Sequence, residues 1–218
     1  FAILVFLWEL FYFLAFTTNK FHLSAFLLRT CMIPAALILP TFTEFVYELV
    51  GKKMNLYFRI FNFGTTFLII LSIYTNLYAH DAGPFLVFHY WPTIGFMSSV
   101  QIILYGINTY LSHSELLIAA LHGSTKLRQQ SRIIIVGTFI GFIGGATNFL
   151  PWFRIPFPPV LNILIPFYVL SVAYAILRHR LMDITVVFRK SLIYSLTLGI
   201  FTAILLIGIF LTAQFLSS

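Results

Sequence analysis

Long apolar runs recur along the whole chain, and they restrict its possible folds more than any other feature. Crossing the hydrocarbon core of a bilayer, about 30 Å thick, takes about 20 apolar residues in a helix. In lipid each backbone N–H and C=O has to be satisfied within its own segment, so such runs form helices. We therefore predict an all-α fold, a polytopic transmembrane helical bundle forming one domain, 1–218, with about seven spans at residues 1–17, 23–50, 57–77, 93–112, 132–150, 160–177 and 191–215.

The composition excludes an ordinary water-soluble domain. Apolar residues make up 60% of the chain and charged residues only 9%, whereas a soluble domain needs about a quarter of its residues charged. The net charge of +7 does not indicate nucleic-acid binding, because the basic residues form short clusters between apolar runs, where cations meet lipid head groups. We expect membrane lipids as partners, together with a second copy of the chain or neighbouring membrane subunits.

The basic residues also predict an orientation. Ten of the 13 Lys and Arg residues lie in or beside three turns, 51–59, 113–131 and 178–190. The opposite set of turns holds Lys20 and Arg154, with Arg29 just inside a span. Because basic turns stay in the cytoplasm, the three basic turns are predicted to be cytoplasmic and the turns near 18–22, 78–92 and 151–159 external.

Small and cyclic residues predict how two of the helices pack. Gly137, Gly141 and Gly145 recur at four-residue spacing in the fifth run. This row lets another helix approach closely, so a helix-packing role is predicted, with a ligand groove as the alternative. Pro34 and Pro40 each remove a backbone donor from the second run, and we expect a kink there.

Two charges lie inside predicted spans, where a charge is costly and often functional. Glu9 lies in the middle of the first run and Arg29 about two turns into the second. These runs form an antiparallel hairpin around residue 19 or 20, which places both residues at similar depth. An ion pair that fixes the register of the hairpin and a ligand or proton site are the two interpretations.

Amide side chains recur at the outer level of the spans. Amides and aromatic rings at one depth can line a pocket open to the outer face. The alternative is that the amides form interhelical hydrogen bonds and the rings an interfacial belt. The candidate ligand-binding residues are Glu9, Arg29, Asn76, Gln101, Asn148, Asn162 and Trp152. The expected ligand is a small apolar molecule or a lipid.

The sequence contains no residue pattern for a bound chromophore, an intramembrane haem or an enzymatic reaction. No lysine lies inside a predicted span, so a retinal Schiff base has no attachment point, and the histidines lie in loops or at span ends, which argues against intramembrane haem. Gly-rich phosphate loops, H-E-x-x-H pairs and nucleophile motifs are missing from the sequence. The chain is therefore predicted not to be an enzyme, with no catalytic residues, no metal site and no identifiable cofactor.

One segment resembles a known family. Residues 174–194 read Tyr-Ala-Ile-Leu-Arg-His-Arg-Leu-Met-Asp-Ile-Thr-Val-Val-Phe-Arg-Lys-Ser-Leu-Ile-Tyr. This resembles the end of the N-terminal seven-helix transmembrane sensory region of bacterial membrane histidine kinases and related receptors, where a similar "YAI-x-R-x-R-L-x-D-I" sequence occurs. The similarity covers about residues 95–200, including 128–137 and the proline-rich turn after it. It implies the membrane-embedded input region of a signal-transducing receptor in a bacterial inner (plasma) membrane.

The same segment is the candidate for signal coupling. It mixes cations with apolar residues, so it can lie in the membrane interface and move with the helices. A plain cytoplasmic anchor is the alternative. The candidate coupling residues are Arg178, Arg180, Asp183 and Arg189.

The chain departs from the family pattern in its ends. It has no phospho-acceptor His-Glu motif and no ATP-binding boxes, so any kinase activity would lie outside it. Six runs precede Leu177 where the family has seven helices, so one helix is expected before Phe1 and a further segment beyond Ser218. Two other interpretations stay open: an accessory or structural transmembrane subunit of a larger complex, and a transporter or channel.

Overall fold

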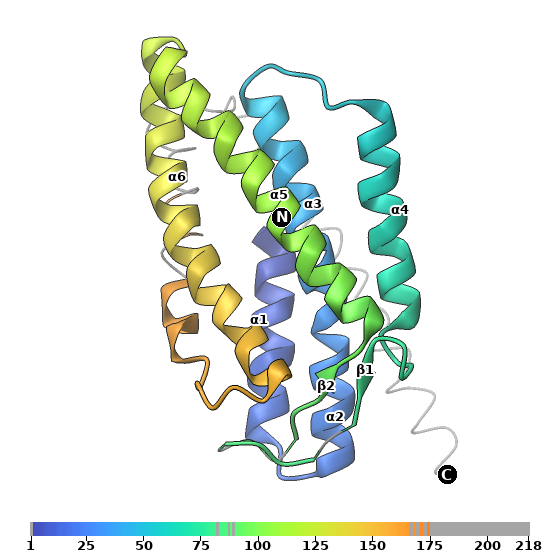
Figure 1. Cartoon of the computed structure of the whole chain (residues 1–218). Coiled ribbons are helices and arrows are strands. Elements are labelled where there is room, and N and C mark those ends of the chain that lie inside the picture. The colour runs from blue at the N-terminus through green and yellow to red at the C-terminus, as the bar shows by residue number, and fades with distance from the viewer. Residues whose placement is uncertain are drawn as a thin grey trace, which may run out of the picture. The chain divides into compact units, whose positions relative to one another are not determined.

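The computed structural model describes residues 2–81, 83–86, 88, 90–165, 168, 171 and 174. This part is mostly helical (Figure 1), which confirms the helical fold class. Its helices are α1 (Ala2–Thr17), α2 (Phe21–Thr30), α3 (Met32–Leu49), α4 (Leu56–Ser72), α5 (Phe96–His122) and α6 (Thr125–Ala146), followed by the 3-10 helices η1 (Thr147–Phe153) and η2 (Val160–Leu164). Two short antiparallel strands, β1 (Ala79–His80) and β2 (Thr93–Ile94), connect α4 to α5.

Several predicted features lie outside the described residues. They are the last apolar run, 191–215, and the candidate coupling residues Arg178, Arg180, Asp183 and Arg189. Within the described part, Phe21–Leu49 and Thr125–Phe153 are each 29 residues long and apolar enough to cross a membrane. Two shorter apolar helices cover Ile3–Thr17 and Leu56–Ser72. The seven crossings remain a prediction.

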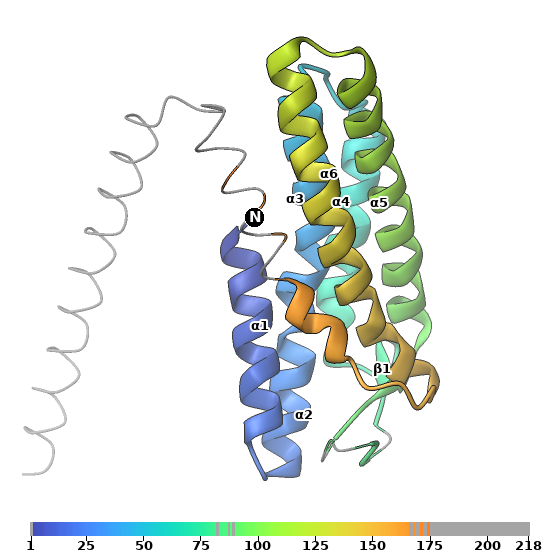
Figure 2. The ribbon, with the colours of Figure 1, turned by 90° about the vertical axis from the view of Figure 1, so that its left-hand side faces the viewer.

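Helices of the described part that are joined by a reversing turn run antiparallel, whereas α3 and α5, which contact each other, run in the same direction (Figure 1). In Figures 1 and 2, α1 lies beside α2, and α3 continues the direction of α2. Helix α5 contacts α3, α4 and α6. Residues 51–55 and 123–124 turn at one end of these helices, while residues 18–20, the two strands and η1 lie at the other (Figure 1). The described turns therefore fall into the same two sets that the charge pattern separates, while the third basic turn, 178–190, lies outside the described residues.

The predicted kink in the second run takes the form of a break at Cys31, between α2 and α3. Pro34 has no N–H for the carbonyl of Thr30, one turn earlier. The neighbouring bonds persist, since Cys31 N donates to Leu27 O at 2.9 Å and Ala35 N donates to Cys31 O at 3.3 Å. Pro40 lies inside α3 without ending it.

The predicted loop 113–131 is wrong. Helix α5 continues to His122 and α6 begins at Thr125, which leaves only Gly123 and Ser124 as the turn. The side chain of Ser124 caps α6 by accepting from the N–H of Leu127. The apolar run ends near residue 112 because the polar residues His113, Ser114 and Glu115 interrupt it, while the helix continues.

Buried polar side chains join α3, α4 and α5. Asn62 and Asn108 exchange two amide hydrogen bonds, each 2.9 Å long. Thr43 Oγ1 lies 2.7 Å from Asn108 Oδ1 and 2.9 Å from Ser112 Oγ. All four side chains are fully buried, so each depends on its neighbours for hydrogen bonding. We call these four residues the polar core.

Glycines on α6 allow close contacts with the residues that follow η1. A Cβ at Gly141 would lie 2.4 Å from Tyr168 Cβ, and one at Gly144 would lie 2.5 Å from Leu161 O. At Gly145, the nearest atom among the described residues would be Trp8 Cη2 at 3.8 Å. Gly137 is buried. Of the predicted glycine row, Gly141 therefore lies at a close contact, whereas a Cβ at Gly145 would make only ordinary van der Waals contacts.

This packing predicts opposite effects for two alanine substitutions. Gly141→Ala should lower the free energy of unfolding by about 1–3 kcal/mol, because its methyl group overlaps Tyr168. Gly106→Ala on α5, where the described residues leave 4 Å of open space, should be neutral or stabilising by up to about 1 kcal/mol. Denaturant titration of the purified chain in micelles measures both. Equal stabilities of the two variants would contradict the proposed contact at Gly141.

Candidate functional site

A cavity of about 70 Å³ lies between α1, α3, α5 and α6. Most of its lining is apolar, including Val5, Ala36, Leu39 and Leu104. Since about 10–15 Å³ is enough for one water molecule, it has room for several waters or a small ligand. We call it the central cavity. The polar or partly polar residues that line it are Trp8, Gln101, Tyr105, Asn108, Asn148, Trp152 and Tyr168.

Two aromatic residues lie beside Gln101 at one end of the central cavity. Tyr78 donates to Gln101 Oε1 at 2.6 Å, and its ring meets that of Trp152 edge to face at 5.8 Å. Burial raises the pKa of the Tyr78 phenol well above its ordinary value, so this hydroxyl remains a donor. The chain segment after α4 is thereby joined to α5 and η1.

Trp8 lines the central cavity and carries a buried hydrogen-bond donor. Its Nε1 has no acceptor among the described residues. By contrast, Tyr105 is satisfied, because its hydroxyl donates to Phe142 O at 2.8 Å. A buried donor without an acceptor costs about 1–3 kcal/mol. A ligand with an acceptor atom would remove that cost.

Asn148 and Asn162 form a reciprocal amide pair. Asn148 Nδ2 donates to Asn162 Oδ1 at 2.6 Å, and Asn162 Nδ2 donates to Asn148 Oδ1 at 3.1 Å. Asn148 lines the central cavity, while Asn162 lines a separate groove that also contains Glu9. The structure therefore brings Gln101, Asn148 and Trp152 to one cavity and links Asn162 to it.

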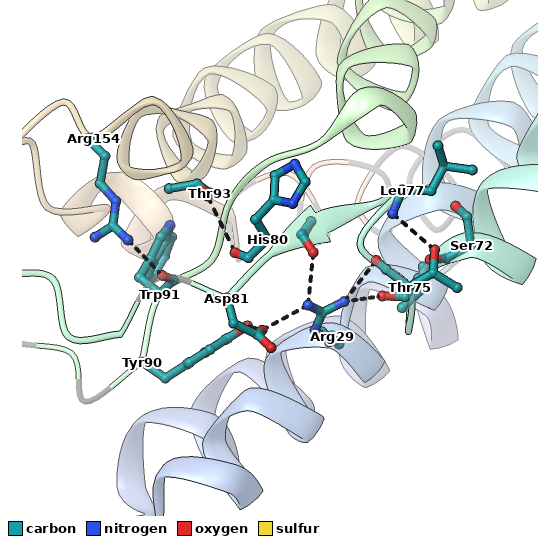
Figure 3. A network of polar contacts seen from close by, with 12 residues as sticks. Arg29, Ser72, Thr75, Leu77, His80, Asp81, Tyr90, Trp91, Thr93 and Arg154 are labelled. Atoms are coloured by element: carbon teal, nitrogen blue, oxygen red, sulfur yellow. Dashed lines mark hydrogen bonds and ion pairs between the residues drawn. The ribbon is translucent and has the colours of Figure 1, made fainter.

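Arg29 belongs to a different cluster, shown in Figure 3. Its Nη1 donates to Ile73 O at 2.8 Å and to Thr75 O at 3.2 Å. Its Nη2 donates to Ala79 O at 2.9 Å and to Asp81 Oδ1 at 2.8 Å. Carbonyls at a helix end lack intrahelical donors, and Arg29 supplies donors to those that follow α4.

The predicted ion pair between Glu9 and Arg29 is therefore wrong. Arg29 pairs with Asp81, while Glu9 Oε1 is buried without a hydrogen-bond partner among the described residues. Depth in the hairpin places both residues correctly but does not fix their rotation about each helix. The carbonyls of Ile73 and Ala79 and the Asp81 carboxylate lie on the side that Arg29 faces and accept its hydrogen bonds.

Tyr90 completes the Arg29 cluster. Its hydroxyl donates to Asp81 Oδ1. Burial, followed by this hydrogen bond, raises the pKa of Tyr90 to about 12, so the phenol stays protonated. The Tyr90 hydrogen bond and then the Arg29 guanidinium lower the pKa of Asp81 from its ordinary value of 3.8. The cluster joins α2 to the connection between α4 and α5.

Asn76 lies apart from both candidate sites. It is exposed in the turn after α4 and lines neither the central cavity nor the groove. The sequence assigned it the same depth as the other amides but contained no signal for its direction. In the described part of the chain, no group of three or more His, Cys, Asp and Glu side chains lies close enough to hold a metal ion.

Comparison of the chain with family models, curated proteins and solved structures finds no match. The central cavity, the groove beside Glu9 and the Arg29 cluster therefore have to be interpreted from their own geometry.

The Arg29 cluster predicts acid sensitivity. Since the pKa of Asp81 is lower in the folded state, its stabilisation is complete above the ordinary value of 3.8 and disappears as the pH falls from there through the folded-state pKa. The loss should be about 1 kcal/mol or less, because the Asp81 side chain is 63% exposed.

Thermal unfolding of the purified chain between pH 6 and pH 3 measures this effect, with Asp81→Asn as the matched variant. The variant should be less stable at pH 6 and lose less stability on acidification. Parallel pH profiles for the two proteins would contradict the assignment.

Proposed function

We propose that the chain is the membrane-embedded input region of a bacterial signal-transducing receptor of the histidine-kinase type. In this proposal it senses a small, largely apolar molecule in the central cavity. The observation that carries the proposal is the cavity itself, whose lining is mainly apolar and includes a few polar groups. Small-molecule sites in proteins have this composition.

The ligand class follows from the polar groups of the cavity. Trp8 offers a donor without an acceptor among the described residues, so the ligand should carry one acceptor oxygen, as a ketone, ester or ether does. Gln101 and Asn148 are already hydrogen-bonded. Their main effect is to limit the size and orientation of the ligand, rather than to offer it hydrogen bonds.

Residues that line the cavity also contact other helices, so a bound ligand can affect how those helices pack. Asn108 lines the cavity and also belongs to the polar core, which joins α3 to α4 and α5. Gly141 lines the cavity and contacts Tyr168. A ligand that favours one packing of these contacts shifts the populations of the bundle. In the proposal this shift reaches the coupling segment, 178–190, whose resemblance to receptor sequences supports the same function.

The proposed membrane placement has support from the two long apolar helices and the exposed side chains. Large apolar residues are exposed on several helices, including Ile3, Tyr57 and Tyr110, at 73%, 83% and 72%. In a bilayer these faces contact lipid or neighbouring membrane subunits. The basic turns near Lys52 and Lys126 lie at the same end of the helices and would face the cytoplasm.

Ligand binding can be tested with 2-butanone and its isosteric alkene, 2-methyl-1-butene. The wild-type chain in nanodiscs should bind the ketone more tightly, because only the ketone can accept from Trp8. Trp8→Phe should weaken ketone binding about threefold to tenfold and leave alkene binding unchanged. Thermal-shift titration measures each affinity.

Trp91→Phe is the matched control, since Trp91 Nε1 is also buried without a described partner but does not line the central cavity. Equal loss of ketone binding in both variants, or no preference for the ketone, would contradict the ligand site. Purification in a fixed stoichiometric complex would favour an accessory subunit, and ion or solute flux in liposomes a transporter or channel.

The orientation has its own test. In a Cys31→Ala background, Asn19→Cys should react with a membrane-impermeant maleimide on intact bacterial cells, and Lys53→Cys should react only after lysis. The two turns lie at opposite ends of the described helices. The reverse labelling pattern would contradict the proposed topology.

A further inference from the structure

We infer that Glu9 anchors a second binding site, separate from the central cavity, for an organic cation with an apolar or aromatic body. The site is the groove between α1 and the chain around η2, with a volume of about 330 Å³. The residues that form it include Glu9, Tyr12, Phe13, Phe16, Pro159 and Asn162. This inference does not depend on the proposed receptor function.

The carboxylate of Glu9 lacks a compensating charge in the described part of the chain. The ion pairs there join Arg29 to Asp81, Lys52 to Glu115 and Arg59 to Glu44. Glu9 Oε1 is buried and has no hydrogen-bond partner among the described residues. Burying an unpaired carboxylate is unfavourable unless a cation or donor joins it. The groove provides space for such a partner beside Glu9.

Aromatic rings continue from the carboxylate along the same face of α1. Tyr12, Phe13 and Phe16 follow Glu9 by three, four and seven residues, the spacing of neighbours on one helix face. The Tyr12 and Phe16 rings meet edge to face at 4.2 Å. Aromatic ring faces attract organic cations. The groove thus combines one acidic side chain with an aromatic wall.

This combination favours an ammonium-type cation over a metal ion. Calcium takes six to eight oxygen ligands and magnesium a near-octahedral set, whereas the groove offers one carboxylate, one amide and one phenol among mainly apolar residues. Phe13 is 63% exposed, so the groove opens outward. An amphipathic cation can therefore reach it from the surrounding lipid.

Benzyltrimethylammonium and its neutral isostere, neopentylbenzene, test the site. Equilibrium dialysis against the full chain in phosphatidylcholine nanodiscs, with empty nanodiscs as background, measures binding of each probe. The wild-type chain should bind the cation above background and prefer it to the isostere. Glu9→Gln should weaken cation binding about tenfold or more, because it removes the charge while keeping the shape.

Two further variants serve as control and second test. Glu48→Gln removes an exposed carboxylate on α3 and should leave cation binding unchanged. Phe13→Leu keeps an apolar side chain on a largely exposed position and should weaken cation binding about threefold by removing one ring. If Glu9→Gln fails to fold, this variant still tests the site in a folded protein.

Three results would overturn the inference. They are cation binding no greater than to empty nanodiscs, equal binding of the cation and its isostere, and wild-type affinity in the Glu9→Gln or Phe13→Leu variant.

Discussion

Hydrogen bonds between buried polar side chains and other segments organise the described structure. Asn62 meets Asn108, and Asn148 meets Asn162, each through two amide hydrogen bonds. Arg29 donates hydrogen bonds to backbone carbonyls that follow α4. Apolar packing alone allows helices to rotate and slide, whereas such directional bonds fix one arrangement.

Much of the helical layout could be predicted from the sequence, because apolar run length and helix formation share one physical cause. The runs 1–17 and 23–50 match α1 and the pair α2 and α3 within a few residues. The same signal missed that α5 and α6 extend to a two-residue turn. Hydropathy measures where a helix becomes polar, while capping groups such as Ser124 determine where it begins.

The sequence predicted the depth of the candidate site residues along their helices but not the direction in which their side chains point. Gln101, Asn148 and Trp152 meet at one cavity, whereas Asn76, at a similar predicted depth, points away from it. The polar core escaped the sequence analysis because Asn62 and Asn108 are 46 residues apart and lie in the inner halves of their runs. Two such side chains meet only if each helix is rotated so that they face each other. A single sequence does not specify this rotation unless polar residues recur along one face of the helix.

The amide pair between Asn148 and Asn162 connects the central cavity to the groove beside Glu9 and can couple the two sites. Each amide both donates and accepts, so turning either side chain breaks both bonds at once. The pair is therefore suited to two discrete states rather than gradual adjustment. Thermodynamic linkage is symmetrical: whatever occupancy of the groove does to affinity in the cavity, occupancy of the cavity does equally to affinity in the groove.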